Sequence, residues 1–204
     1  MNSGVSEDMY VLELARRRKS VRAYASSPIE LGDVLYALRA AIQAPSGANQ
    51  QPWRFIIITD PEVKARVRRV CEEGERKFYA SVRGELRRWL DERGFTWRKP
   101  FLTEAPVLVA VFADMHKPYA VQSTWLAIGY MLLALEERGL GSLTYTPPNP
   151  GEVARTLGAP RGYMLQVLIP VGRSRDQRPK EPRKSLEEVA YVDSWSKRLS
   201  DVLS

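Results

Sequence analysis

Cysteine and histidine are almost absent from this 204-residue chain, which contains one of each, Cys71 and His116. A single cysteine excludes an intramolecular disulfide and any zinc site built from several cysteines. A single histidine makes histidine-ligated metal centres and Ser-His-Asp catalysis poor hypotheses, so no metal is expected. We interpret His116 as a surface loop residue and Cys71 as a partly buried helix residue rather than a reactive thiol.

Long hydrophobic runs are also missing. No apolar run reaches the roughly 18 residues that a membrane-spanning helix requires. The first ten residues, MNSGVSEDMY, lack the basic and apolar regions of a signal peptide. We therefore expect a cytoplasmic protein without membrane contact, and the length fits one domain with a substantial core.

Charge of one sign is in excess, with 31 Lys and Arg against 24 Asp and Glu and a formal net charge of +7. Such a chain can bind nucleic acid, an anionic membrane surface or a phosphorylated small molecule, or it can simply have a basic surface. Helix-turn-helix, RNP and zinc-finger patterns are absent, which disfavours a nucleic-acid-binding module. The GxGxxG and Walker fingerprints of dinucleotide and P-loop sites are absent as well.

Apolar periodicity predicts alternating helices and strands, hence an α/β or α+β class with a mostly buried sheet. We expect helices over residues 6–18, 31–44, 60–79, 119–138 and 151–157. Strands are expected over residues 53–59, 105–113 and 164–171, with a short one beginning at 143–145. Residues 125–135 (WLAIGYMLLAL) are apolar on nearly all faces, which predicts full burial in a core or a subunit interface.

The segment 72–100 is dense in charge, and its glycines at 74, 84 and 94 weaken any continuous helix. It contains too many aromatic residues for a disordered tail. We expect an exposed, partly helical lobe that forms a mobile cover over a ligand.

Four groups of residues could carry chemistry. Residues 16–22 contain five basic side chains at a helix end, where they can bind a phosphate or merely cap the helix. The small-residue loop 44–53 can offer backbone amides and Ser46 to a planar polar ligand, or be an ordinary turn. Thr144 and Thr146 share one face if a strand continues to Thr146, and are otherwise a plain strand exit.

The fourth group is Glu75, Tyr79 and Lys99. Glu75 and Tyr79 are four residues apart and share one helix face. A carboxylate, a phenol and an ammonium together can bind a zwitterionic amino acid, with Glu75 on the α-ammonium and Lys99 on the α-carboxylate. From spacing alone, a solvated charged face is the alternative.

The order of these segments resembles the nitroreductase-like flavoprotein family. The resemblance rests on residues 18–22 (RKSVR), 44–55 (APSGANQQPWRF), 127–146 (AIGYMLLALEERGLGSLTYT) and 165–189 (LQVLIPVGRSRDQRPKEPRKSLEEV). It implies an α+β fold with a central, mostly antiparallel sheet flanked by helices, in an intertwined homodimer. It also implies one domain over residues 1–204, with 72–104 as a substrate lid and 173–204 as a C-terminal extension over the partner subunit.

The same resemblance implies FMN as the cofactor, bound at the subunit interface. The residues implied to bind it are Arg18, Lys19, Ser20, Arg22, Pro45, Ser46, Thr144, Tyr145, Thr146 and Arg183. The basic residues and Ser20 would hold the phosphate and ribityl end. Ser46 and its neighbours would reach the isoalloxazine from the partner subunit, and residues 144–146 would line its other edge.

A narrower resemblance, to the iodotyrosine deiodinase subfamily, rests on residues 75–79 (ERKFY), 97–99 (WRK), 103–106 (TEAP) and 145–147 (YTP). It implies reductive dehalogenation of halotyrosines, with Glu75, Tyr79, Lys99 and the backbone N–H of Ala48 binding the substrate. Thr146 would be catalytic, with its hydroxyl at flavin N5. The alternative is a general NAD(P)H-dependent nitro or quinone reductase that takes nitroaromatics. For the protein in general, the expected electron donor is NAD(P)H or a reductase.

Overall fold

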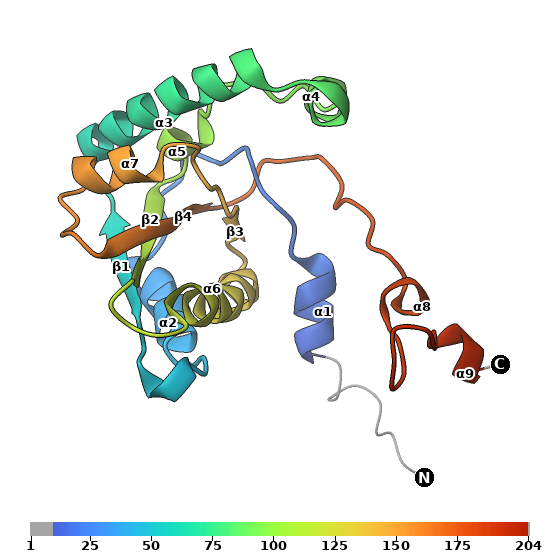
Figure 1. The fold of residues 1–204 in the computed structure, drawn as a ribbon. Helices are drawn as coiled ribbons and strands as arrows, with labels where there is room; N and C mark the ends of the chain where they lie inside the picture. Colours follow the sequence, from blue (N-terminus) through green and yellow to red (C-terminus); the bar gives the residue numbers. More distant parts are fainter. Residues whose placement is uncertain (1–9, 204) are drawn as a thin grey trace, which may run out of the picture.

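A four-stranded antiparallel sheet forms the centre of the protein (Figure 1). The computed structural model describes residues 10–203, so the predicted start of the first helix, residues 6–9, lies outside the described residues. The strand order is β1-β2-β4-β3, with bounds β1 (Trp53–Ile58), β2 (Val107–Asp114), β3 (Gly141–Ser142) and β4 (Tyr163–Gly172). The predicted α+β class and antiparallel sheet are confirmed.

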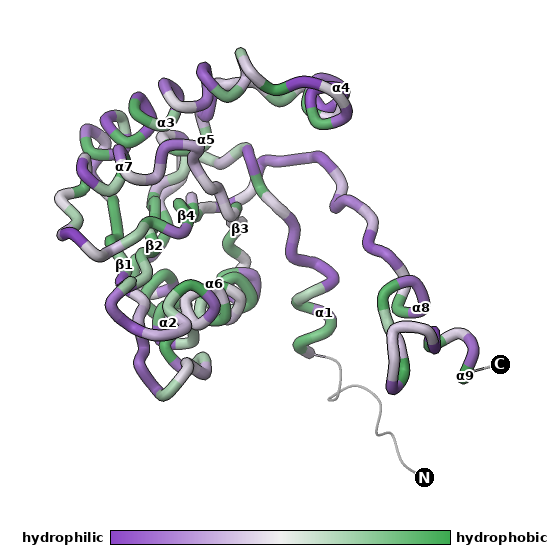
Figure 2. The backbone as a smooth tube through the Cα atoms, in the orientation of Figure 1, coloured by the Kyte–Doolittle hydropathy of each residue, from purple (hydrophilic) through white to green (hydrophobic). Residues whose placement is uncertain are grey.

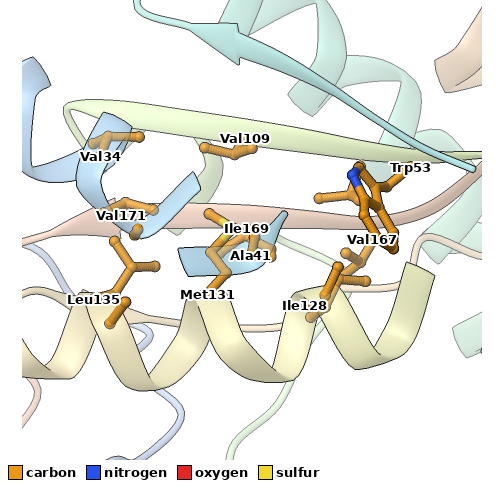
Figure 3. Packing of buried hydrophobic residues seen from close by; sticks show 14 of the residues in the cluster. Val34, Ala41, Trp53, Val109, Ile128, Met131, Leu135, Val167, Ile169 and Val171 are labelled. Carbon is orange, nitrogen blue, oxygen red and sulfur yellow. The ribbon is translucent and has the colours of Figure 1, made fainter. Parts of the chain in front are cut away.

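Helices cover both faces of the sheet. On one face α2 (Leu31–Ala41) and α6 (Ala120–Glu137) pack against β1, β2 and β4, with Ile128, Met131 and Leu135 turned toward the strands (Figure 3). On the other face lie α3 (Pro61–Ser81), α5 (Phe101–Glu104) and α7 (Pro150–Thr156). Figure 2 shows the most hydrophobic residues concentrated on the strands between these layers, as burial of a two-sided sheet requires.

The helix α3 is longer and more continuous than predicted. Its start follows from Asp60, whose side chain accepts hydrogen bonds from the N–H groups of Glu62 and Val63, and from Pro61 at the first helical position. The expectation that Gly74 weakens the helix is wrong. A Cβ at Gly74 would lie 2.4 Å from the side-chain oxygen of Asn149, so the glycine lets α3 pack closely against the start of α7.

The prediction of a short strand beginning at residues 143–145 is also wrong, because the strand lies earlier in the chain. β3 comprises only Gly141 and Ser142, and the pairing with β4 resumes as a single bridge between Tyr145 and Leu168. In this register Leu143 lies opposite Pro170, which has no N–H to donate, so the ladder is interrupted there.

The helix α6 is buried on one face only within this chain. Trp125, Leu126 and Tyr130 are exposed on its outer face, so the predicted full burial of residues 125–135 is not reached inside one chain. Among residues 10–203, no helix is long and apolar enough to cross a membrane.

Three further segments extend from the sheet and its helices. They are α4 (Gly84–Glu92), α1 (Tyr10–Arg17) and the C-terminal tail with α8 (Leu186–Val189) and α9 (Ser200–Leu203) (Figure 1). Gly84 is the first residue of α4 and Gly94 lies two residues after its end, both with positive φ, so no continuous helix runs through these two glycines, as predicted.

Candidate functional site

The basic segment 18–22 runs in extended form from the end of α1 to the edge of the sheet. Ser20 forms a parallel bridge with Ser142, and the N–H of Val21 donates to the Ser142 carbonyl at 3.0 Å. Because Ser142 is only two residues before Thr144, this pairing places the basic segment beside residues 144–146.

The C-terminal tail returns along the same segment and is fixed to it by Asp176. The Nζ of Lys19 donates to the Asp176 carbonyl at 2.6 Å, and the N–H of Arg22 donates to the Asp176 carboxylate at 2.7 Å. The Arg178 guanidinium lies 2.6 Å from the same carboxylate. Burial alone would raise the pKa of Asp176, but the hydrogen bonds from Arg178 and Arg22 outweigh it and hold that pKa well below its usual range.

These segments enclose a cavity of about 270 Å³, here called the basic cavity. Lys19, Ser20, Arg22 and Arg183, which the sequence assigned to one phosphate site, line it together. Four further tail residues also line it and were not predicted: Arg178, Pro179, Lys180 and Glu181. The many basic residues of the tail could have indicated an anion site there. Their spacing alone, however, does not identify which of them line the cavity.

The basic cavity fits an anion. Arg18, which the sequence assigned to the same phosphate site, does not line the cavity. Its buried Nε nevertheless has no hydrogen-bond partner within residues 10–203. Burial, and then the neighbouring Arg183 guanidinium, lower the pKa of Arg18, and burial and Arg178 do the same for Arg22. Crowded, partly desolvated guanidiniums are stabilised by an anion, and a phosphate can accept several of their donors at once.

A second cavity of about 540 Å³ adjoins the first. It is here called the acidic cavity after Glu75, the carboxylate in its wall. The two share Arg22, Trp89, Phe95 and Arg178 in their walls. The acidic cavity is lined by the residues that the sequence placed at the substrate and the flavin edge: Glu75, Tyr79, Lys99, Thr144, Tyr145 and Thr146. Thr144 and Thr146 both line it, although the strand does not continue to Thr146.

Glu75, Tyr79 and Lys99 lie together, as predicted. The Nζ of Lys99 is 3.1 Å from Oε2 of Glu75 and 5.0 Å from the Tyr79 ring centroid. Glu75 and Lys99 are only 6% and 8% exposed, so the alternative of a solvated charged face is wrong for this pair. Burial lowers the pKa of Lys99, and the Glu75 carboxylate opposes that shift.

Residues of segment 84–98 form part of the wall of the acidic cavity. The Arg22 guanidinium lies 4.7 Å from the Phe95 ring, and Arg93, stacked 4.3 Å over Trp89, forms an ion pair with Glu181 at 3.1 Å. Segment 84–98 is therefore attached to both the basic segment and the tail.

The loop 45–51 lies apart from both cavities, so the structure does not bring Pro45, Ser46 and Ala48 together with the other predicted residues within one chain. Its backbone is nevertheless unusual. Ala48, Asn49 and Gln51 have positive φ, a conformation that costs about 1 kcal/mol or more per residue outside glycine and clusters at ligand sites. Ser46 Oγ accepts from the Gln51 N–H at 3.0 Å and helps to fix the loop.

The sequence predicts no chemical role for Cys71 and His116. Cys71 is fully buried, and burial raises the pKa of its thiol to about 12, so it is not a reactive thiolate. His116 has an exposed side chain paired with Asp114 at 2.9 Å. Among the described residues, no group of three or more acidic, histidine or cysteine side chains is arranged to hold a metal ion.

Comparison with known proteins agrees with this geometry. The chain belongs to the nitroreductase family, whose model matches residues 15–173. Within it, iodotyrosine deiodinase of Thermotoga neapolitana is 51% identical over 174 residues, covering 85% of this chain and 94% of that protein. Human iodotyrosine deiodinase 1 is 33% identical over 200 residues, covering 90% of this chain and 68% of its own length.

A solved structure is similar as well. A crystal structure of oxidized iodotyrosine deiodinase bound to FMN and 3-iodo-L-tyrosine matches with a TM-score of 0.88 and 48% identity, covering 91% of this chain and 100% of that one. The resemblance inferred from the motifs is thereby confirmed.

Proposed function

We propose that this protein is an FMN-dependent oxidoreductase that reductively dehalogenates halotyrosines. The observation that carries the proposal is the acidic cavity, in which Glu75, Tyr79 and Lys99 meet directly beside a basic cavity suited to a phosphate. The 51% identity to an iodotyrosine deiodinase supports the same reaction.

The basic cavity is proposed to hold the phosphate and ribityl end of FMN through Arg18, Lys19, Ser20, Arg22 and Arg183. Its crowded guanidiniums and the unpaired Nε of Arg18 fit such an anion. Residues 144–146 would line the isoalloxazine, and the hydroxyl of Thr146, an exposed residue, would be the donor to N5. When bound, the flavin supplies the two electrons that, with one proton, replace the carbon–halogen bond by carbon–hydrogen and release halide.

The acidic cavity is proposed to bind the amino-acid end of the substrate. Glu75 takes the α-ammonium, Lys99 takes the α-carboxylate and Tyr79 packs over the substrate. Because both charged side chains are nearly buried, their pairing with the zwitterion takes place in a medium where electrostatic interactions are strong.

A homodimer is proposed to complete each site. Exposed apolar residues on α6 and α2, among them Trp125, Leu126 and Leu35, supply a surface for a second copy. The partner subunit would then bring Pro45 and Ser46 to the flavin and the Ala48 N–H to the phenolate oxygen. In the same proposal, residues 72–104 form the substrate lid, and residues 173–204 form a C-terminal extension over the partner subunit.

The electron donor is proposed to be NAD(P)H or a separate reductase. The cytoplasmic location indicated by the sequence stays a prediction.

The test is iodide release from 3-iodotyrosine by the FMN-loaded protein with dithionite as reductant. Glu75→Gln and Lys99→Ala are each expected to lower kcat/KM at least tenfold, because each leaves one buried charge without its partner. The matched controls are Glu73→Gln and Lys77→Ala, at exposed positions of α3, the helix that carries Glu75. Both should behave as the unchanged protein.

Absent iodide release, or release that is indifferent to both site variants, contradicts the proposal. Turnover of nitroaromatics that exceeds halotyrosine turnover and ignores both variants would favour the general nitroreductase instead.

A further inference from the structure

Tyr145 lines the acidic cavity and is held in place through both its backbone and its ring. Its backbone N–H and carbonyl both bond to Leu168, at 2.9 and 2.8 Å. Its ring packs edge-on against Phe101 of α5, with centroids 5.4 Å apart, and the residue is 8% exposed. The direction of its hydroxyl is therefore set by the sheet and by α5.

That hydroxyl points to the carboxylate of the proposed substrate clamp. The Tyr145 hydroxyl donates to Oε1 of Glu75 at 2.8 Å, while Lys99 lies 3.1 Å from Oε2. Each carboxylate oxygen thus has its own donor, one neutral and one charged. Burial raises the pKa of Tyr145 far above its usual range, so the phenol remains a hydrogen-bond donor wherever the protein is folded.

We propose that Tyr145 is a positioning residue, whose hydroxyl holds Glu75 through Oε1 so that Oε2 and the Lys99 ammonium, which pair with each other in this structure, can turn to the two charges of an amino-acid substrate. The inference rests on the proposed function of Glu75. It gives the segment 144–146 two tasks, because Thr144 and Thr146 face the proposed flavin edge while Tyr145 between them orients the amino-acid clamp. Affinity for the zwitterion then depends on Tyr145 without any contact between the two.

The test variant is Tyr145→Phe, which removes only the hydroxyl and keeps the ring against Phe101. With the FMN-loaded protein, flavin fluorescence quenching is titrated with 3-iodotyrosine and with 2-iodophenol, which lacks the zwitterion. The dissociation constant for 3-iodotyrosine is expected to rise about tenfold, because a buried hydrogen bond to a charged group is lost. The value for 2-iodophenol is expected to stay within about twofold.

The ratio of the two constants is measured on one sample, so a partly unfolded preparation does not distort it. Tyr163→Phe, a half-buried tyrosine at the start of β4, is the control for loss of a phenolic hydroxyl and should leave both constants unchanged. In a Glu75→Gln background, Tyr145→Phe should add less than twofold, since the two residues act through one another.

Equal weakening of both ligands by Tyr145→Phe would assign the hydroxyl to the flavin or to general stability and overturn the inference. An unchanged 3-iodotyrosine constant would overturn it too. If Glu75→Gln by itself leaves halotyrosine binding intact, the proposed function of Glu75 fails. This outcome is distinct from failure of the Tyr145 inference alone, because the effect of Glu75→Gln is measured separately.

Discussion

Asp176 organises the cations of the basic cavity through a single carboxylate. Its side chain is 3% exposed and accepts hydrogen bonds from the Arg22 N–H and the Arg178 guanidinium. The folded protein holds its pKa below the unfolded value, so the ionised form stabilises the fold above that unfolded value. The stabilisation is lost as the pH falls through the lowered folded pKa.

Asp176→Asn is therefore expected to destabilise the protein by about 2 kcal/mol at pH 7, the loss of charge-assisted hydrogen bonds in a buried site. The difference in unfolding free energy from the unchanged protein should be constant down to about pH 4 and shrink only below it. Urea unfolding at several pH values measures this. Asp193→Asn, at an exposed carboxylate paired only with Lys197, is the control and should change stability by less than about 0.5 kcal/mol.

Single residues also mark how far the sequence could predict the site. The pairing of Glu75 with Lys99 was predictable as a hypothesis, because i, i+4 spacing joined Glu75 to Tyr79 and family resemblance joined both to Lys99. The burial of the pair was not predictable, because it depends on how segment 84–98 folds over α3. Asp176 and Arg178 gave no signal, because eight of the twelve residues in 173–184 are charged.

At the scale of elements, long periodic segments were predicted well and short ones poorly. The apolar runs that became β2 and β4 are buried on both faces, and the run that became β1 is half-buried at the sheet edge, so their composition alone identified them. β3 was misplaced because its limits come from Pro170 on another strand, a constraint that no local pattern contains. The continuity of α3 through Gly74 depends likewise on Asn149, 75 residues further along the chain.

That contact predicts an unusual result for Gly74→Ala. Alanine favours a helix interior over glycine by about 1 kcal/mol, so propensity alone predicts stabilisation. A Cβ 2.4 Å from the Asn149 side-chain oxygen must instead displace that side chain, whose amide donates to the Val70 carbonyl at 2.9 Å and to Glu152 at 2.6 Å. We expect net destabilisation by about 1 to 3 kcal/mol and weaker halotyrosine binding.

Thermal unfolding and flavin fluorescence titration measure the two effects. Gly32→Ala in α2, where a Cβ meets nothing within 4 Å, is the matched control and should be neutral or slightly stabilising. A Gly74→Ala variant as stable as the control would contradict the close packing of α3 on Asn149.

At the scale of the whole molecule, the loop 45–51 is separated from the two cavities, yet it carries three strained non-glycine residues. Backbone strain of this kind is expected where a ligand or partner uses the conformation. A second copy would bring this loop to the cavities of the first, and the exposed apolar face of α6 would be buried in the same step. Dimerisation and cofactor binding should therefore be coupled.

Leu126→Glu on α6 tests that coupling, since a carboxylate at a residue now 48% exposed costs little in one chain but much in an apolar interface. We expect a monomer in sedimentation velocity and at least tenfold weaker FMN binding. Met115→Glu, an equally exposed apolar residue beside His116, is the control and should remain dimeric with unchanged FMN affinity.

The unchanged protein offers a second measure of the same coupling. If FMN binds only across the interface, mass action makes its apparent affinity depend on protein concentration, and added FMN must shift monomers toward dimer by the same free energy. Dilution at fixed free FMN should release flavin from the unchanged protein and from Met115→Glu alike. A Leu126→Glu monomer that keeps full FMN affinity at every concentration would show that one chain suffices, and would remove Ser46 and Ala48 from the site.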